Sequence, residues 1–426
     1  MENFRIESLE INKIGAFEHL KMDFPKKTDP EKAEIHILTG ENGTGKTTIL
    51  EALAEIAKYK IDTSEQTGLI NKLDLNSVIS VITHPKKYST NLELDDIVQN
   101  RSSKNMIGKD IQTKMNERLG VDFALFAYSG YRRINQSKMI SIDKGRFSFP
   151  DALNDALNFD NSINTDKLTQ WIGTAIAQEA LSILKGDSQR ASKYRNYVKI
   201  IEEIIEEITN EQVSFDLNAD TMHLNIIINK QKLALTSLPD GLKSLISWIG
   251  DLVMRMSQIG WAFDIPIFER NFILFLDEIE VHLHPAWQRK ILPVVQELFK
   301  NAQIFISTHS PFVVGSVDGA WVHKLKKVGA YAVLDGEPVL TEDAESYDTI
   351  LEEVFGIKER FGKDIEILLK EFREITKEIL KGNEARLERW QQIILIFQNQ
   401  TRPDEIMSLI TPQIHQINRI RKQVIA

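Results

Sequence analysis

A glycine-rich segment that also carries one lysine and two adjacent threonines could bind phosphate. The run Gly40-Glu41-Asn42-Gly43-Thr44-Gly45-Lys46-Thr47-Thr48 satisfies the pattern G-x-x-x-x-G-K-[ST]. Apolar residues at 35–38 predict a strand before it, and the helical spacing of 49–56 predicts a helix after it. In that setting backbone N–H groups surround a polyphosphate, Lys46 reaches its β- and γ-phosphates, and Thr47 can ligate Mg²⁺. We therefore predict a nucleoside triphosphate site formed by Asn42, Gly43, Thr44, Gly45, Lys46, Thr47 and Thr48.

Two carboxylates follow an uninterrupted apolar run. Residues 272–276 predict a strand buried on both faces of a parallel sheet, and Asp277 and Glu278 come directly after it. A phosphate loop needs a carboxylate that holds Mg²⁺ and a group that orients the attacking water. We assign Thr47 to Mg²⁺ as a ligand, Asp277 to Mg²⁺ through a water molecule, and Glu278 to the water nucleophile.

Histidines lie near these carboxylates in the predicted sheet. A helix over 286–300 leads to the next strand, 303–308, which ends at His309. A neutral imidazole there can donate to the γ-phosphate or hold the water, so His309 is our second catalytic candidate. His282 and His284 alternate and could ligate zinc, but no third ligand is identified. We expect them in a polar turn at an interface between subunits.

The remaining elements must bring these segments together. Two short strands surround a turn at Gly15, 123–128 predicts another strand, and Leu238-Pro239-Asp240-Gly241 opens an amphipathic helix. We predict an α/β fold with a mostly parallel sheet and an antiparallel β subdomain. The predicted divisions are a head at 1–340, a helical insertion within it at about 61–210 with helices near 151–186 and 191–210, a hairpin at 213–228 that returns to the sheet, and a charged helical extension at 341–426.

Composition limits the class of protein. The chain has 426 residues, of which 42% are hydrophobic and 27% charged, as in soluble globular proteins. The absence of cysteine excludes disulfides, thiolate zinc sites and cysteine nucleophiles. No apolar run approaches the ~18 residues of a membrane span, and the first residues lack signal-peptide regions, so we expect a cytoplasmic protein. The net charge of −9 argues against a uniformly DNA-coating surface but leaves a local basic groove open.

Together these motifs resemble a family, the ABC-type ATPases of the SMC/RecF class, in particular the OLD-related antiphage branch. The resemblance rests on Gly40–Thr48, Leu238–Ser244, Leu276–Pro285 and Ser307–Pro311. The run Asp277-Glu278-x-x-x-His282-Leu283-His284-Pro285 is the most discriminating part, because transport-type ABC ATPases carry a different segment there. Within this branch the chain is most similar to ATPase subunits of Septu-type systems, which are paired with an HNH nuclease. The segment 347–356 and the charged helices after it match that C-terminal extension.

The resemblance implies how the site is completed. In such ATPases two subunits sandwich two ATP molecules, and each signature loop contacts the nucleotide of the other subunit. Pro239, Asp240, Gly241 and Lys243 would take that part here. Pro239 and Asp240 replace a serine and a glycine of the usual loop, which implies slow hydrolysis. Tyr131-Arg132-Arg133 occupies the approximate place of the Q-loop glutamine.

The resemblance also implies partners. We expect ATP and Mg²⁺ as ligands, a homodimer or higher homo-oligomer, and an HNH nuclease subunit (PtuB-like) bound by the C-terminal helices. Nucleic acid would be contacted through the complex, and no membrane is involved. The chain shows no nuclease cluster of its own, since Leu334-Asp335-Gly336 lacks the acidic residues of a TOPRIM domain. Two alternatives stay open: a RecF/SMC-like DNA-repair ATPase that binds DNA directly, and the ATPase sensor of a PARIS-type defence system. A transporter subunit fits the His-Leu-His-Pro run poorly.

Overall fold

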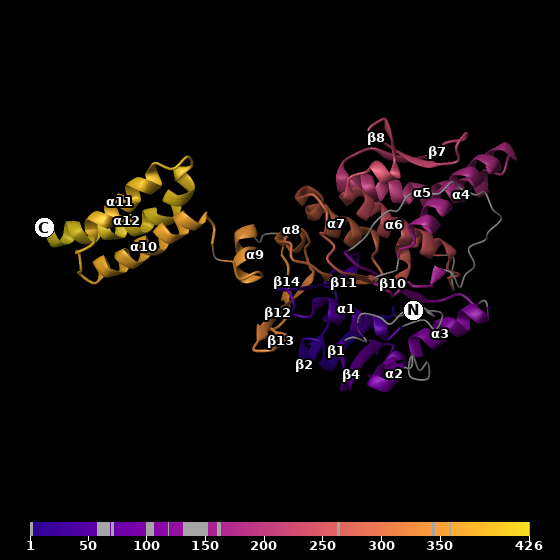
Figure 1. Cartoon of the computed structure of the whole chain (residues 1–426), viewed down its shortest axis with the longest axis horizontal. Coiled ribbons are helices and arrows are strands. Elements are labelled where there is room, and N and C mark those ends of the chain that lie inside the picture. The colour runs from indigo at the N-terminus through magenta and orange to yellow at the C-terminus, as the bar shows by residue number, and fades with distance from the viewer. Residues whose placement is uncertain are drawn as a thin grey trace. The chain divides into compact units, whose positions relative to one another are not determined.

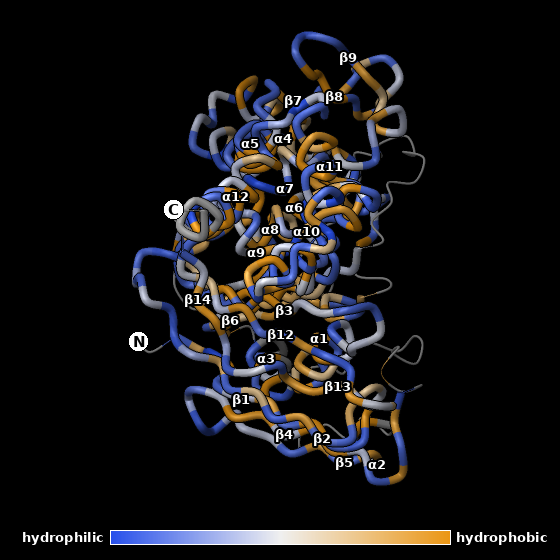
Figure 2. The backbone as a smooth tube through the Cα atoms, turned by 90° about the vertical axis from the view of Figure 1, so that its left-hand side faces the viewer, coloured by the Kyte–Doolittle hydropathy of each residue, from blue (hydrophilic) through white to orange (hydrophobic). Residues whose placement is uncertain are grey.

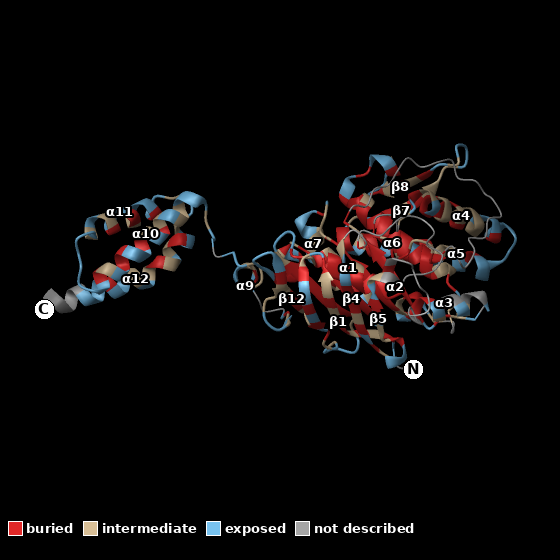
Figure 3. Ribbon diagram, turned by 60° about the horizontal axis from the view of Figure 1, so that its bottom comes forward, coloured by how far each residue is buried: buried red, intermediate tan, exposed pale blue. Residues whose placement is uncertain are grey.

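The chain divides into two compact units, each with its own hydrophobic core. The computed structural model describes residues 3–57, 69, 72–98, 106–117, 119–130, 152–159, 163–261, 265–342, 346–357 and 359–425. The units are 1–355 and 356–426 (Figure 1), and buried residues form a separate interior in each (Figure 3). The division therefore falls later than the predicted 340/341. Helix α9 (Tyr347–Glu353) belongs to the first unit because Ile350 is 2% exposed and joins its core.

The central sheet has seven strands and is mainly parallel. Its members are β3 (Glu34–Gly40), β6 (Phe123–Tyr128), β10 (Asn271–Leu276), β11 (Ala302–Ser307), β12 (Trp321–Val328), β13 (Tyr331–Leu334) and β14 (Val339–Leu340). Their order is β13-β12-β3-β11-β10-β6, with β14 also paired to β12. The pairs from β12 to β6 are parallel, whereas β13 and β14 run antiparallel to β12. β10 and β11 are buried almost throughout, which confirms the predicted strands.

A second, antiparallel sheet contains β1 (Arg5–Ile14), β2 (Phe17–Asp23), β4 (Leu73–His84) and β5 (Thr90–Glu93), in the order β2-β1-β4-β5. The helical insertion predicted at about 61–210 is therefore wrong at 73–93, where β4 pairs with β1. β4 buries Ile79 and Val81, but Ile82 on its other face is 49% exposed. Apolar residues on both faces hid the alternation that identifies a half-buried strand.

Helices cover both faces of the central sheet. On one side, α1 (Lys46–Glu55) contacts strands of both sheets, and α2 (Leu94–Val98) and α3 (Met106–Asn116) lie near the antiparallel sheet (Figure 1). On the other side are α4 (Thr165–Leu184), α5 (Ser188–Thr209), α6 (Asp240–Gln258) and α7 (Pro285–Leu298), and the short α8 (Pro311–Val314) follows β11. Hydrophobic residues concentrate along the central strands and on α1 (Figure 2).

The first helix predicted near 151–186 begins later. Residues 152–159 form turns, and α4 starts at Thr165. The start is fixed because the Asn164 side chain accepts a hydrogen bond from the Lys167 N–H, which is an N-cap.

The predicted hairpin is present, but it does not join the central sheet. β7 (Val213–Leu217), β8 (Leu224–Ile228) and β9 (Gln231–Ala234) form a separate three-stranded sheet. Carboxylates of α5 cover the free edge of β7: Glu206 accepts from the Val213 N–H and Glu202 from the Phe215 N–H, both at 2.8 Å. Edge groups that are paired with a helix have no need of another strand.

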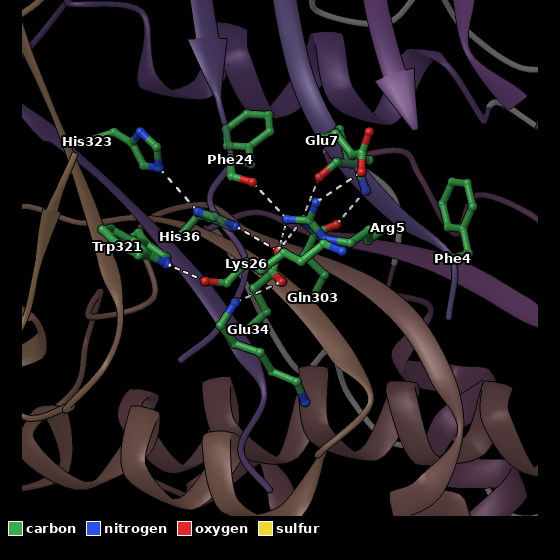
Figure 4. A network of polar contacts seen from close by, with 12 residues as sticks. Phe4, Arg5, Glu7, Phe24, Lys26, Glu34, His36, Gln303, Trp321 and His323 are labelled. Carbon is green, nitrogen blue, oxygen red and sulfur yellow. Dashed lines mark hydrogen bonds and ion pairs between the residues drawn. The ribbon is translucent and has the colours of Figure 1, made fainter. Parts of the chain in front are cut away.

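A buried polar network ties the two sheets together at the N-terminal ends of β3 and β11 (Figure 4). Glu34 accepts hydrogen bonds from Arg5 at 2.8 Å and Gln303 at 2.6 Å, and lies 3.1 Å from a ring nitrogen of His36. The other ring nitrogen of His36 lies 3.2 Å from His323. Burial raises the pKa of Glu34, but the hydrogen bonds from His36 and Arg5 outweigh it and lower the pKa to about 2.

The second unit is a three-helix arrangement of α10 (Lys363–Leu380), α11 (Leu387–Gln398) and α12 (Pro403–Ile425). Phe372 stacks on Trp390 with ring centroids 5.5 Å apart, and the Trp390 indole N–H donates to Thr376 at 2.8 Å. This interior gives the C-terminal helices a core independent of the first unit. Among the helices that the structure describes, none is long and apolar enough to cross a membrane.

Candidate phosphate-binding and catalytic site

The glycine-rich segment forms a loop between β3 and α1. Gly40, Gly43 and Gly45 have φ values of 147°, 76° and 85°, which side chains rarely adopt. A Cβ at Gly40 would collide with the Leu325 carbonyl, and one at Gly45 would lie 2.5 Å from the Phe17 ring. Both glycines therefore let the loop pass close to neighbouring strands and turn toward the start of α1.

Lys46 lies over this loop. Its Nζ donates to the carbonyls of Gly40 at 2.9 Å and Glu41 at 3.0 Å, and the Thr44 hydroxyl donates to Glu41 at 2.8 Å. Burial lowers the pKa of Lys46, and the nearby carboxylates of Asp277 and Glu278 oppose that shift. The ammonium of a buried lysine beside loop N–H groups is suited to an anionic ligand.

Asp277 connects the end of β10 to the loop. The Thr47 hydroxyl donates to Asp277 Oδ2 at 2.9 Å, and the Ser307 hydroxyl donates to Oδ1 at 2.5 Å. A hydroxyl and a carboxylate in contact offer the hard oxygen ligands that Mg²⁺ prefers, so the residues present fit that ion. Mg²⁺ bound there would neutralise charge on the phosphates.

Glu278 adopts a left-handed backbone conformation with φ of 46°. Its N–H donates to the Ser307 hydroxyl at 2.8 Å. Burial, together with the charges of Asp277 and Glu280, raises the pKa of its carboxyl. A strained backbone and a raised pKa are features of a carboxylate placed for proton transfer.

His309 faces the same space. It lines a cavity of about 520 Å³ with Lys46, Thr47 and Glu278. Burial, reinforced by the charge of Lys46, lowers the pKa of its imidazole, so the ring is neutral near pH 7. A neutral imidazole can donate one hydrogen bond to a phosphate or a water molecule.

Most of the predicted loop residues line this cavity: Asn42, Gly43, Gly45, Lys46, Thr47 and Thr48. Thr44 is fully buried. Asp277 contacts Thr47, which lines the cavity. The structure therefore brings together the loop, both carboxylates and His309, which lie far apart in the sequence.

Comparison with known proteins assigns the chain to a family. Residues 35–315 match a family model described as "AAA domain, putative AbiEii toxin, Type IV TA system". The chain belongs to this AAA-domain family.

Relatives of the AAA-domain chain include two curated proteins. It is 21% identical to the "Retron Ec83 probable ATPase" of Escherichia coli, over 87% of this chain and 80% of that protein. It is also 21% identical to the "Septu protein PtuA" of Bacillus thuringiensis, over 90% and 91% of the two chains. A crystal structure of an SMC head bound to the C-winged helix domain of ScpA aligns with a TM-score of 0.46 and 12% identity, covering 80% and 98% of the two chains.

The predicted signature loop lies elsewhere in the AAA-domain unit. Pro239, Asp240, Gly241 and Lys243 are not among the described residues that line the cavity. The start of α6 instead packs on the turn after the carboxylates, where a Cβ at Gly241 would lie 2.7 Å from the His282 carbonyl oxygen. Asp240 is exposed and lies 3.2 Å from the ammonium of Lys243. Tyr131-Arg132-Arg133 falls outside the residues that the structure describes.

His284 has a local role in this turn. Its Nδ1 accepts a hydrogen bond from the Ala286 N–H at 3.2 Å, which caps α7. Within the described part of the chain, no group of three or more metal-ligating side chains is present.

Several residues near the site were not predicted. Gly15, Ala16 and Lys72 line the cavity, and the Lys72 ammonium lies 2.5 Å from Glu51 on α1. Gly130, after β6, lies close to Glu278, since a Cβ there would be 2.9 Å from the Cβ of Glu278. The Gly15 turn was visible in the sequence, but no pattern links Lys72 or Gly130 to a loop so distant along the chain.

Proposed function

We propose that this chain is the ATP-binding and ATP-hydrolysing subunit of a cytoplasmic antiphage defence complex, in which it controls a separate HNH nuclease. The observation that carries the enzymatic part is the cavity where Lys46, Thr47, Glu278 and His309 meet, with Asp277 held against Thr47. The names of two relatives, a retron ATPase and a Septu protein, support the defence setting.

Each side chain has a distinct task in the proposed hydrolysis. Lys46 and the loop N–H groups bind the β- and γ-phosphates, while Thr47 and Asp277 hold Mg²⁺. Glu278 orients the attacking water and accepts its proton, and a raised pKa makes its carboxylate a better base. Neutral His309 donates a hydrogen bond to the γ-phosphate as charge develops.

We further propose that a second copy completes the site. The N-terminus of α6 lies outside the described lining of the cavity of its own subunit: Pro239 and Asp240 are exposed, the Asp240 side chain by 71%, and Gly241 packs on the turn that contains His282. In an ATP-bound dimer these residues and Lys243 would meet the phosphates held by the other subunit. A carboxylate at Asp240 repels phosphate, so we expect slow turnover in which ATP acts mainly as a control ligand.

The C-terminal unit is the proposed nuclease-docking element. It has its own core and exposes large apolar side chains, with Ile367 at 56% and Leu395 at 57%. These exposed apolar side chains are the contacts that we propose for a protein partner. Nucleic acid would then be reached through the complex.

Substitution of the loop lysine tests the nucleotide site. Lys46→Ala should lose tight ATP binding, measured by isothermal titration calorimetry with Mg²⁺, because the ammonium that pairs with the phosphates is gone. Lys370→Ala, which removes an exposed lysine of α10, is the matched control and should bind as wild type. Unchanged affinity in Lys46→Ala would refute the site.

Truncation tests the partner. A chain ending at Phe355 should bind ATP as the full chain does, since the first core uses no later residue, but should fail to co-purify with the proposed HNH partner when the two are co-expressed. Retained co-purification would refute the docking element. Salt-sensitive DNA binding by the full chain alone would instead favour a DNA-repair ATPase.

A further inference from the structure

Glu280 follows the candidate carboxylates Asp277 and Glu278 in the sequence and contacts the segment that carries His309. It follows β10 in the same turn as Glu278, yet its Oε1 accepts a hydrogen bond from the His309 N–H at 2.6 Å. Glu280 is not among the described residues that line the cavity, whereas Glu278 and His309 are. Its contact with the site therefore runs through the backbone of His309.

The placement of this carboxylate is costly. Its second oxygen, Oε2, is buried and has no hydrogen-bond partner among the described residues. Burial raises the pKa of Glu280, and hydrogen bonds from His309 and Thr308 offset that rise only in part. A carboxylate with a buried and unpaired oxygen lowers the stability of the fold. Its presence therefore calls for an explanation.

The neighbouring contacts hold the chain on both sides of His309. On one side of His309 the Thr308 N–H donates to the Leu38 carbonyl at 3.1 Å, and on the other the Ser310 hydroxyl donates to Gln288 at 2.6 Å. Glu280 supplies the bond to the N–H of His309 itself. The three contacts fix the chain where β11 ends, and they fix the direction in which the imidazole leaves it.

We propose that Glu280 is a positioning residue that holds His309 over the γ-phosphate side of the cavity by accepting its backbone N–H. The inference rests on the proposed hydrolysis at this site. The positioning role requires a side chain long enough to reach the His309 N–H and an acceptor oxygen at its end. It does not require the negative charge.

Two conservative substitutions separate reach from charge. Glu280→Gln keeps the length and an acceptor oxygen, whereas Glu280→Asp keeps the charge but is shorter by one methylene. Steady-state ATP hydrolysis should show kcat near wild type for Glu280→Gln and about tenfold lower for Glu280→Asp, with KM within about twofold in both. Glu297→Asp, on an exposed glutamate of α7, is the matched control and should change neither constant.

A double-mutant cycle tests whether the effect runs through His309. If it does, Glu280→Asp should lower kcat no further in a His309→Ala background, since the group being positioned is already absent. Additive losses would overturn the proposal. It would also be overturned if Glu280→Asp keeps full kcat, or if Glu280→Gln is impaired while Glu280→Asp is active.

Failure of the proposed function would look different. In that case wild type and Lys46→Ala would hydrolyse ATP equally slowly. This comparison does not involve any Glu280 variant. Mg-ATP affinity, measured for each Glu280 variant, confirms that the variant is folded and separates a loss of kcat from a loss of binding.

Discussion

Gly130 gives the sharpest structural test of the catalytic role proposed for Glu278. It follows β6, and a Cβ added to it would lie 2.9 Å from Glu278 Cβ and 3.2 Å from Glu278 Oε2. Its φ lies outside the left-handed region, so alanine can adopt the same backbone without strain. The nearest atoms that the new methyl group meets belong to Glu278.

The size of that effect follows from the distances. An ordinary contact begins near 3.4 Å, so Glu278 must move by about 0.5 Å to admit the new methyl group. Glu278 already holds a positive φ and cannot retreat freely. A misplacement of about 1 Å can lower catalysis about 100-fold, so we expect kcat to fall about tenfold in Gly130→Ala, with ATP affinity unchanged.

The assay is steady-state phosphate release, paired with calorimetric binding of Mg-ATP. Gly362→Ala is the control, because a Cβ at Gly362 meets nothing within 4 Å and its φ is also ordinary. Wild-type kcat in Gly130→Ala would refute the placement of Glu278, and so would a loss of ATP binding without a change in kcat.

Two further predictions concern stability. Glu34 has a folded pKa of about 2, below its ordinary 4.5, so it contributes stability above pH 4.5 that is lost as the pH falls toward 2. Urea unfolding should show that acidification over this range costs about 3 kcal/mol more in wild type than in Glu34→Gln. Gly241→Ala places a Cβ 2.7 Å from the His282 carbonyl oxygen and 3.1 Å from the Trp287 ring, so it should lower the free energy of unfolding by about 1–2 kcal/mol, measured by urea denaturation against Gly362→Ala.

Equal acid sensitivity of wild type and Glu34→Gln would show that this carboxylate is not held ionised by His36 and Arg5. Unchanged stability of Gly241→Ala would show that the start of α6 does not pack closely on the turn that contains His282.

The parts of the fold with local signals were predictable from the sequence. The glycines and the lysine identify the phosphate loop. Residues 272–276 are apolar throughout because β10 is covered on both faces. The order of such segments then predicts a mainly parallel sheet, and a parallel sheet places the ends of β10 and β11 side by side. The ends of β10 and β11 therefore predict that Asp277, Glu278 and His309 lie near the loop.

Features that depend on distant partners were not predictable. β4 is a strand because β1 pairs with it, not because of its own alternation. The β7 hairpin forms its own sheet because glutamates of α5 satisfy its edge. Gly130 matters only for what lies opposite it in space, and the role inferred for Glu280 depends on a hydrogen bond that spans 29 residues. None of these has a periodicity or motif that a single sequence reveals.

The most direct test of the central claim is the behaviour of Glu278→Gln. If Glu278 is the residue that activates water beside a bound nucleotide, this variant should bind Mg-ATP with wild-type affinity, hydrolyse it at least about 100-fold more slowly, and accumulate as the ATP-bound dimer in light scattering. Turnover at the wild-type rate in Glu278→Gln would contradict the account.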